Sequence, residues 1–314
     1  MEAATTASAA ARATPSLGVA RRRYGEDLIK AVLFLAALVS VLTTTGIVVS
    51  LLRETVVFFE SVGVGEFLFG KDWSPVIKPQ SFGVLPLVGG TFLITGIALL
   101  VAVPLGLGSA VYLSEYASPR VRRTVKPVLE LTAGVPTIVF GYFALTFFTP
   151  NILEDIARLE VGVFNALSAA IIMGFMVVPT IASVSEDAMS AVPAALREGS
   201  YGLGATKFQT STRVVFPAAL SGIVAAVVLG ASRAIGETMI VLVAAGQVAA
   251  LTADAREPMY TMTSYIGAVA KGDLATGSVQ YKTVFAVGML LFLITLVLNA
   301  ISIRFVRKYR QVYE

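Results

Sequence analysis

Residues 198–217 read EGSYGLGATKFQTSTRVVFP, and the apolar run that follows contains RAIGET at positions 233–238. The first stretch is polar and rich in glycine, whereas the second places Arg233 and Glu237 in otherwise uncharged surroundings. We interpret the first stretch as a surface that receives force from a soluble partner. We interpret the second as charge placed on a path through a membrane, and the rest of the chain is read around these two stretches.

The composition excludes a soluble globular domain. Of the 314 residues, 56% are hydrophobic and only 14% are charged, whereas a soluble domain carries about 25% charged residues. Cys and His are both absent, so the chain has no disulfide framework, no thiolate metal site and no His general base. It also lacks a Walker-type phosphate loop. We therefore expect no catalysis and no bound cofactor here, and ATP that drives this protein must bind another chain.

Long apolar runs predict an all-α polytopic membrane protein with six transmembrane helices. We place these spans at about 28–52, 85–113, 127–148, 164–184, 216–245 and 283–303. Residues 1–27 are rich in Ala, Ser, Thr and Arg without apolar periodicity, so we predict a disordered cytoplasmic tail. An organellar transit peptide is the weaker alternative for this tail. A single transmembrane domain, residues 28–314, follows it.

Most of the 24 Lys and Arg residues fall in tails and loops on one side of this arrangement. The positive-inside rule therefore places both termini and residues 185–213 in the cytoplasm. The cations are divided among short loops, so the partner they predict is the lipid bilayer and no nucleic acid. Glu115 and Glu130 flank the basic loop between spans two and three, and we expect them to pair with Arg122 or Arg123.

The cytoplasmic segment 185–213 predicts a helix–turn–helix at the membrane surface. Pro193 suits a first helical residue, Gly204 suits a close turn or a positive φ, and Thr206 suits the N-cap of a second helix. An ordinary interspan loop is the alternative. Connections between helices usually run about 2–8 residues, however, and long ordered loops are usually functional. A protein that does energised work without a nucleotide site needs a rigid polar lever of this kind.

The spacing of Glu198, Gly204 and Pro217 resembles the E-A-A-x3-G-x9-I-x-L-P signature of permease subunits of bacterial ABC importers. Gly and Ser stand at the two positions that are Ala-Ala in the signature, and its last apolar positions hold conservative variants. The resemblance implies that this segment is a coupling helix, which docks in a cleft of an ATPase subunit. The coupling residues that it implies are Arg197, Glu198, Gly199, Ser200, Gly204 and Pro217.

Arg233 and Glu237 are four residues apart, so we expect them to share one helix face. A charge at the bilayer centre costs about 2.5–3.5 kcal/mol on insertion scales, so such residues face a protein interior or a water-filled cavity. Both a role in the solute pathway or gate and a purely structural ion pair stay open. A buried guanidinium suits an oxyanion because its planar fork donates two hydrogen bonds. This argument does not select one anion.

The motif RAIGETM at 233–239 closely resembles the R-A-L-G-E-T-M of the PstC family, one of the two permease types of phosphate ABC importers. The sister type, PstA, usually continues after Glu-Thr with Ala-Pro. The blocks EFLFGKDWSP at 66–75 and ELTAGVPTIVFG at 130–141 also agree with the PstC family. The resemblance covers roughly residues 66–310 and implies the fold of MetI-like ABC permeases. It places Arg233, Glu237 and Thr238 in the substrate pathway or its gate.

The same resemblance implies partners and a location. The partners are a sister permease PstA, a dimer of the ATPase PstB that binds ATP and Mg, the phosphate-binding protein PstS and inorganic phosphate. The location is the inner membrane of a bacterial cell, which the chain crosses several times. Alternatives are the PstA role, a permease for another oxyanion, or an ion-coupled secondary carrier. A scaffold without transport gives no account of the charges within span five.

Overall fold

The computed structural model describes residues 24–270, 272, 274–275 and 277–309. Helices make up most of this part of the chain, three of them π-helical (η1–η3), and two short strands pair in antiparallel register. In chain order the elements are α1 (Tyr24–Phe59), α2 (Val64–Phe69), β1 (Trp73–Ser74), β2 (Ser81–Phe82), α3 (Leu85–Val111), η1 (Tyr112–Tyr116), α4 (Pro119–Thr132), α5 (Thr137–Phe143), η2 (Ala144–Ile156), α6 (Ala166–Ser190), α7 (Ala194–Gly202), α8 (Lys207–Thr210), η3 (Ser211–Val215), α9 (Phe216–Ala218), α10 (Leu220–Ile235), α11 (Met239–Ala244), α12 (Met262–Ala270) and α13 (Val279–Tyr309).

Four of the helices are long and apolar enough to cross a membrane, namely α1, α3 with η1, α6 and α13. They coincide with four of the predicted spans. Two further helix pairs pass the same test but are bent, and six spans result within the described residues when each bent pair counts as one. Helix α1 begins at Tyr24, so the end of the predicted tail 1–27 is helical, and residues 1–23 lie outside the described part.

The predicted span 127–148 is not one straight helix. Helix α4 ends at Thr132, α5 begins at Thr137, and the axes of α4 and α5–η2 differ by 85°. Pro136 lacks an N–H and disfavours helical backbone at the residue before it, so it starts the second helix. Pro104 and Pro179, in contrast, lie inside unbroken helices. The expectation of one continuous helix over 127–148, which would hold Pro136 in its interior, was therefore wrong.

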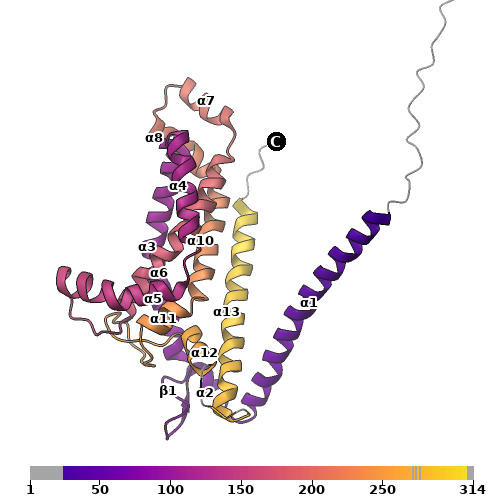
Figure 1. The fold of residues 1–314 in the computed structure, drawn as a ribbon, viewed down its shortest axis with the longest axis vertical. Helices are drawn as coiled ribbons and strands as arrows, with labels where there is room; N and C mark the ends of the chain where they lie inside the picture. Colours follow the sequence, from indigo (N-terminus) through magenta and orange to yellow (C-terminus); the bar gives the residue numbers. More distant parts are fainter. Residues whose placement is uncertain (1–23, 271, 273, 276, 310–314) are drawn as a thin grey trace, which may run out of the picture. The chain divides into compact units, whose positions relative to one another are not determined.

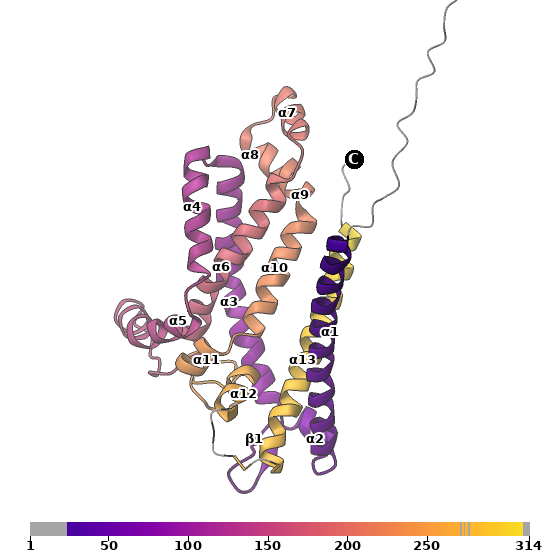
Figure 2. The same cartoon turned by 45° about the vertical axis from the view of Figure 1, so that its right-hand side comes forward.

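The predicted span 216–245 is also divided. A 72° bend separates α8–α9 from α10, and a second break at 236–238 separates α10 from α11. Figures 1 and 2 show α7 and α8 at the same end as the C-terminal end of α13, with α11, α12 and the β-hairpin at the opposite end. This arrangement agrees with the prediction that segment 185–213 and the C-terminal tail share one side of the membrane.

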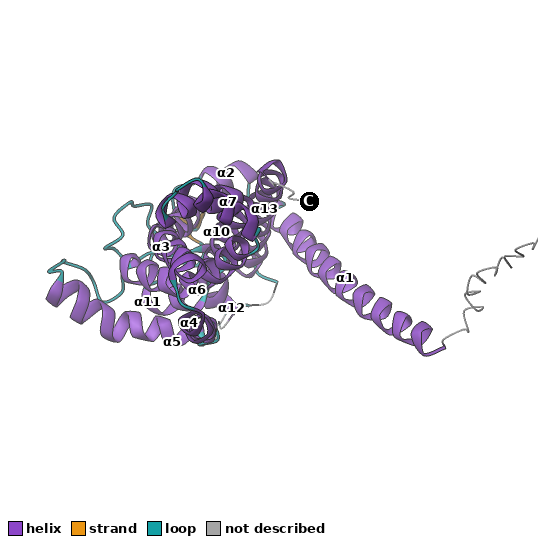
Figure 3. Ribbon diagram, turned by 90° about the horizontal axis from the view of Figure 1, so that it is seen from above, coloured by secondary structure: helices purple, strands orange, loops and turns teal. Residues whose placement is uncertain are grey.

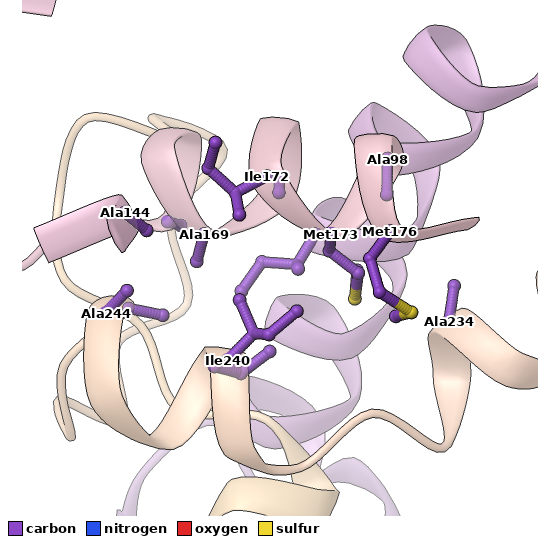
Figure 4. Packing of buried hydrophobic residues seen from close by; sticks show 14 of the residues in the cluster. Ala98, Ala144, Ala169, Ile172, Met173, Met176, Ala234, Ile240 and Ala244 are labelled. Atoms are coloured by element: carbon purple, nitrogen blue, oxygen red, sulfur yellow. The ribbon is translucent and has the colours of Figure 1, made fainter. Parts of the chain in front are cut away.

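Helix α6 is the centre of the packing, with α3, α10 and α11 around it (Figure 3). Figure 4 shows Met173 and Met176 of α6 among small side chains of the neighbouring helices, including Ala98 and Ala234. At Gly174 a Cβ would come within 2.8 Å of the Ala98 carbonyl oxygen. Small residues let helices approach closely in a membrane, where packing replaces the hydrophobic effect between helices.

A separate aromatic cluster lies at the end opposite α7. The side chains of Phe58, Phe67, Phe82 and Trp73 are buried and meet edge to face, and Trp73 also packs on Tyr265 of α12 with ring centroids 5.0 Å apart. Edge-to-face pairs are favoured by the ring quadrupoles. The cluster packs the hairpin and α2 against α12, so this end of the membrane domain has an ordered aromatic core of its own.

Candidate coupling segment and membrane site

The segment from Pro193 to Thr210 forms the predicted helix–turn–helix, although Pro193 precedes the first helical residue, Ala194, instead of being that residue. Pro193 precedes α7, and Gly204 adopts a φ of +81°, which a residue with a Cβ rarely does. The Thr206 side chain accepts a hydrogen bond from the Gln209 backbone N–H, and the Gln209 side chain accepts one from the Thr206 backbone N–H. This capping box starts α8. The predicted helix–turn–helix, the positive φ and the N-cap are confirmed.

The turn between α7 and α8 exposes apolar side chains at the end of the molecule. Leu203 is 91% exposed and Phe208 is 69% exposed, and Glu198 on α7 is exposed as well. A Cβ added at Gly199 or Gly204 would meet nothing within 4 Å. Exposed apolar side chains grouped on an ordered polar segment are typical of an interaction surface. We call the surface formed by residues 198–208 the coupling tip.

Two of the predicted coupling residues instead face inward. The Arg197 guanidinium donates to Glu115 Oε1 and to the carbonyl oxygens of Met189 and Val192. The Ser200 hydroxyl lies 2.9 Å from the Thr210 hydroxyl, which ties α7 to α8. Pro217 lies in the short helix α9, outside the coupling tip and exposed. Of the predicted set, only Glu198, Gly199 and Gly204 lie on the coupling tip.

Arg233 and Glu237 do not share a helix face, because α10 ends at Ile235 and Gly236 begins a break. The Arg233 Nη1 donates to the Thr180 hydroxyl of α6 at 2.9 Å. The Glu237 carboxylate instead accepts from the backbone N–H groups of Met239 and Ile240, at 2.9 and 3.2 Å. No ion pair joins the two charges within the part of the chain that the structure describes. Glu237 therefore caps α11, where the helix dipole favours a negative charge.

The break between α10 and α11 is fixed in place by α12. The Thr263 hydroxyl donates to the Glu237 carbonyl oxygen at 2.6 Å. The Thr238 methyl group packs on α12 so closely that a Cβ at Gly267 would lie 2.9 Å from it. Non-helical backbone at membrane depth is tolerated only where protein buries it or where it lines a water-filled cavity. The RAIGET motif thus contains an ordered interruption of the predicted span five, which contacts with α12 hold in place.

Sequence reasoning missed Glu186, whose side chain is fully buried near the end of α6. Arg122 and Lys126 of α4 both pair with it, the second through an Nζ–Oε2 contact of 2.6 Å. The expected pairing of Glu115 and Glu130 with Arg122 or Arg123 was wrong, since Glu115 accepts from Arg197 and Glu130 from Ser183. The one available signal was the pair Glu186–Asp187 at the end of an apolar run.

These features are those of a polytopic membrane subunit of the transporter class, with a break within the predicted fifth span and an ordered polar segment between the fourth and fifth spans. The family model described as "Binding-protein-dependent transport system inner membrane component" matches residues 102–311. The chain belongs to this family, whose members are the non-catalytic permease subunits of ABC transporters. It is a multi-pass membrane protein.

The chain is also similar to several individual permease proteins. The chain is 35% identical to a "Probable ABC transporter permease protein YqgH" of Bacillus subtilis, over 79% of each chain. It is 30% identical to a "Phosphate transport system permease protein PstC" of Mesorhizobium japonicum, over 96% of each chain. It is 37% identical to a PstC 1 of Mycobacterium tuberculosis, over 72% of this chain and 73% of the relative.

Solved structures share the fold. A chain of a bacterial alginate ABC transporter matches with a TM-score of 0.64 at 18% identity, over 93% of this chain and 100% of that one. A chain of the inward-facing MetNI methionine transporter matches with a TM-score of 0.56 at 21% identity, over 72% and 96%. The predicted all-α, MetI-like permease fold is confirmed.

Proposed function

We propose that the chain is the PstC-type permease subunit of an ATP-driven phosphate importer and forms half of its translocation pathway. The observation that carries the proposal is the similarity to a phosphate transport permease over 96% of both chains. The chain lacks Cys, His and a Walker-type nucleotide-binding loop. ATP and Mg are therefore assigned to a partner ATPase.

The state of Arg233 supports an anion as the transported solute. Its guanidinium is half-buried, and the one hydrogen bond that it forms among the described residues goes to the neutral hydroxyl of Thr180. The carboxylate of Glu237 accepts hydrogen bonds from the first backbone N–H groups of α11. The positive charge is thus not neutralised within the described chain, and a planar fork with free donors suits phosphate oxygens. We assign Arg233 to the solute pathway, and Glu237 and Thr238 to the break that positions it.

The coupling tip supports a partner ATPase. Its exposed Leu203 and Phe208 need a covering surface, and Glu198 has no hydrogen bond or ion pair within the described residues. We propose, as the sequence resemblance to the PstC family implies, a complex with a PstA sister permease, a PstB dimer at the coupling tip and PstS at the opposite end. We place this complex in the inner membrane of a bacterial cell.

Reconstitution of the complex in vesicles tests the proposal. We expect ATP-dependent phosphate uptake that vanadate abolishes and that requires the binding protein. Sulfate at the same concentration serves as the matched competitor, because it is a tetrahedral oxyanion of similar size. Uptake of another anion in preference to phosphate contradicts the assigned substrate. Uptake driven by an ion gradient without ATP contradicts the ABC mechanism as a whole.

A further inference from the structure

The Arg197 side chain joins three elements at one guanidinium. Its Nη2 donates to Glu115 Oε1 at 3.0 Å and to the Met189 carbonyl oxygen at 2.8 Å, and its Nη1 donates to the Val192 carbonyl oxygen at 2.5 Å. Glu115 belongs to η1, which continues α3, and Met189 lies in the last turn of α6. Arg197 itself belongs to α7. The contacts therefore connect α7 to the ends of the two membrane helices α3 and α6.

This connection is buried, so it cannot be exchanged freely for water. The Glu115 side chain is 4% exposed and the Arg197 side chain 20%. A buried carboxylate needs a charged partner, and removing that partner strongly disfavours the arrangement. Cations near the last carbonyls of a helix are also favoured by its dipole. The geometry therefore resists any tilt of α7 away from α3 and α6.

A second charged cluster, centred on one buried carboxylate, holds the same end of α6 to α4. The fully buried Glu186 pairs with Arg122 and Lys126, and the Ser190 hydroxyl links Glu186 to Arg122 through contacts of 2.8 Å each. Ser190 is the last residue of α6. Polar contacts of Arg197 and Glu186 thus join the end of α6 to α7 and to α4, and Arg197 also joins α7 to η1.

We infer that Arg197 is a positioning residue that locks the coupling helix α7 to the membrane helices, so that they move as one body. Arg197 is then no contact of the ATPase, although it lies next to Glu198 in the coupling signature. This inference rests on the proposed docking of an ATPase at the coupling tip. It explains how a displacement of the coupling tip reaches α3 and α6. Without this lock, bending of the chain at residues 191–193 would absorb the displacement.

Neighbouring residues of α7 provide matched variants. Arg197→Gln removes the charge and the fork, and Arg197→Lys keeps the charge but cannot reach all three acceptors in one geometry. Glu115→Gln keeps size and an acceptor oxygen but removes the other charge. Glu198→Gln is the control for the distance measurement alone, because Glu198 is exposed on the same helix and has no partner among the described residues, although it lies on the coupling tip. Each variant is assembled into the full complex.

Two measurements separate positioning from docking. The first is ATP hydrolysed per phosphate imported, together with the amount of ATPase that co-purifies. The second is the width of the distance distribution between spin labels on cysteines at Leu203 and Leu100, which are exposed on the coupling tip and on α3. The chain has no native Cys that would compete for the labels.

We expect Arg197→Gln and Glu115→Gln to raise ATP consumed per phosphate about tenfold, a usual size for coupling between sites. Both variants also broaden the distance distribution, Arg197→Lys restores it in part, and ATPase co-purifies as in the wild type. The control Glu198→Gln keeps the narrow distribution.

Unchanged widths and unchanged coupling in both variants overturn the inference. Loss of ATPase from Arg197→Gln with a narrow distribution also overturns it, because Arg197 is then a docking contact. If Arg197→Gln does not assemble, Glu115→Gln provides the same test with a milder change. A wild-type complex that does not carry phosphate contradicts only the proposed function, since the distances are measured without substrate.

Discussion

Arg233→Gln tests the solute pathway most specifically. A hydrogen bond to a charged group contributes about 1.5–3 kcal/mol, which corresponds to about 10- to 150-fold in a binding or rate constant. Gln keeps one amide donor but loses the charge and the second arm of the fork. We therefore expect phosphate uptake to fall by about this factor, which brings it close to background.

The fold has little reason to fail in this variant. Arg233 is half-buried and gives up one hydrogen bond, to the Thr180 hydroxyl. Because the donor is charged, such a bond contributes about 1.5–3 kcal/mol to stability, which is less than the roughly 5–15 kcal/mol by which a folded domain is stable. We therefore expect the Arg233→Gln complex to assemble with its partners in wild-type amounts. The assay is initial-rate uptake of radiolabelled phosphate into vesicles, normalised to assembled complex.

Two controls complete this experiment. Arg233→Lys keeps the charge without the planar fork and should retain part of the uptake. Thr180→Val removes the partner of Arg233 and should leave uptake close to wild type. Wild-type uptake by Arg233→Gln refutes the assignment of Arg233 to the pathway. An equal loss in Thr180→Val shows instead that the Arg233–Thr180 contact matters for structure.

Three further changes test other parts of the account. Gly204→Leu strains a backbone at φ +81°, at a cost of about 1–2 kcal/mol, and should lower coupled transport. The control is Gly199→Leu, whose side chain meets the same open space but on a helical backbone. Equal transport by the two variants excludes a role for the turn conformation. Glu237→Ala removes the cap of α11, which should lower the free energy of unfolding by about 0.5–2 kcal/mol. Thermal unfolding should therefore begin at a lower temperature than in the control Glu198→Ala. An unchanged midpoint of thermal unfolding contradicts the cap. Gly174→Val places a Cβ 2.8 Å from the Ala98 carbonyl oxygen. This overpacking should lower the stability by about 1–3 kcal/mol and reduce the yield of assembled complex. A normal yield of complex contradicts the close approach of α3 and α6.

Features that depend on local chemistry were predictable from the sequence. Apolar runs of sufficient length mark the long helices, and the Gly204 turn and the Thr206 cap follow from the backbone preferences of those residue types. The exposed tip around Glu198 follows from the same reading, since a polar helix–turn–helix between apolar runs has to lie outside the membrane. These expectations need no knowledge of which helices pack together.

Features that depend on helix packing were not predictable. Pro104 and Pro179 continue their helices while Pro136 starts a new one, because neighbouring helices decide whether a break is accommodated. Glu237 looked like the partner of Arg233 in an unbroken helix, but the break at Gly236 turns it into a cap. The pairing of Glu186 with Lys126 joins residues 60 positions apart, which sequence spacing alone does not connect.

The central claim is that an ATPase moves this permease from the coupling tip. A single cysteine at Leu203, or at Ile77 in the hairpin at the opposite end, can be cross-linked within the assembled complex because the native chain has no Cys. The account predicts that Leu203→Cys cross-links to the ATPase subunit and Ile77→Cys does not. An ATPase cross-link from position 77, or none from position 203 in a complex that transports, contradicts it.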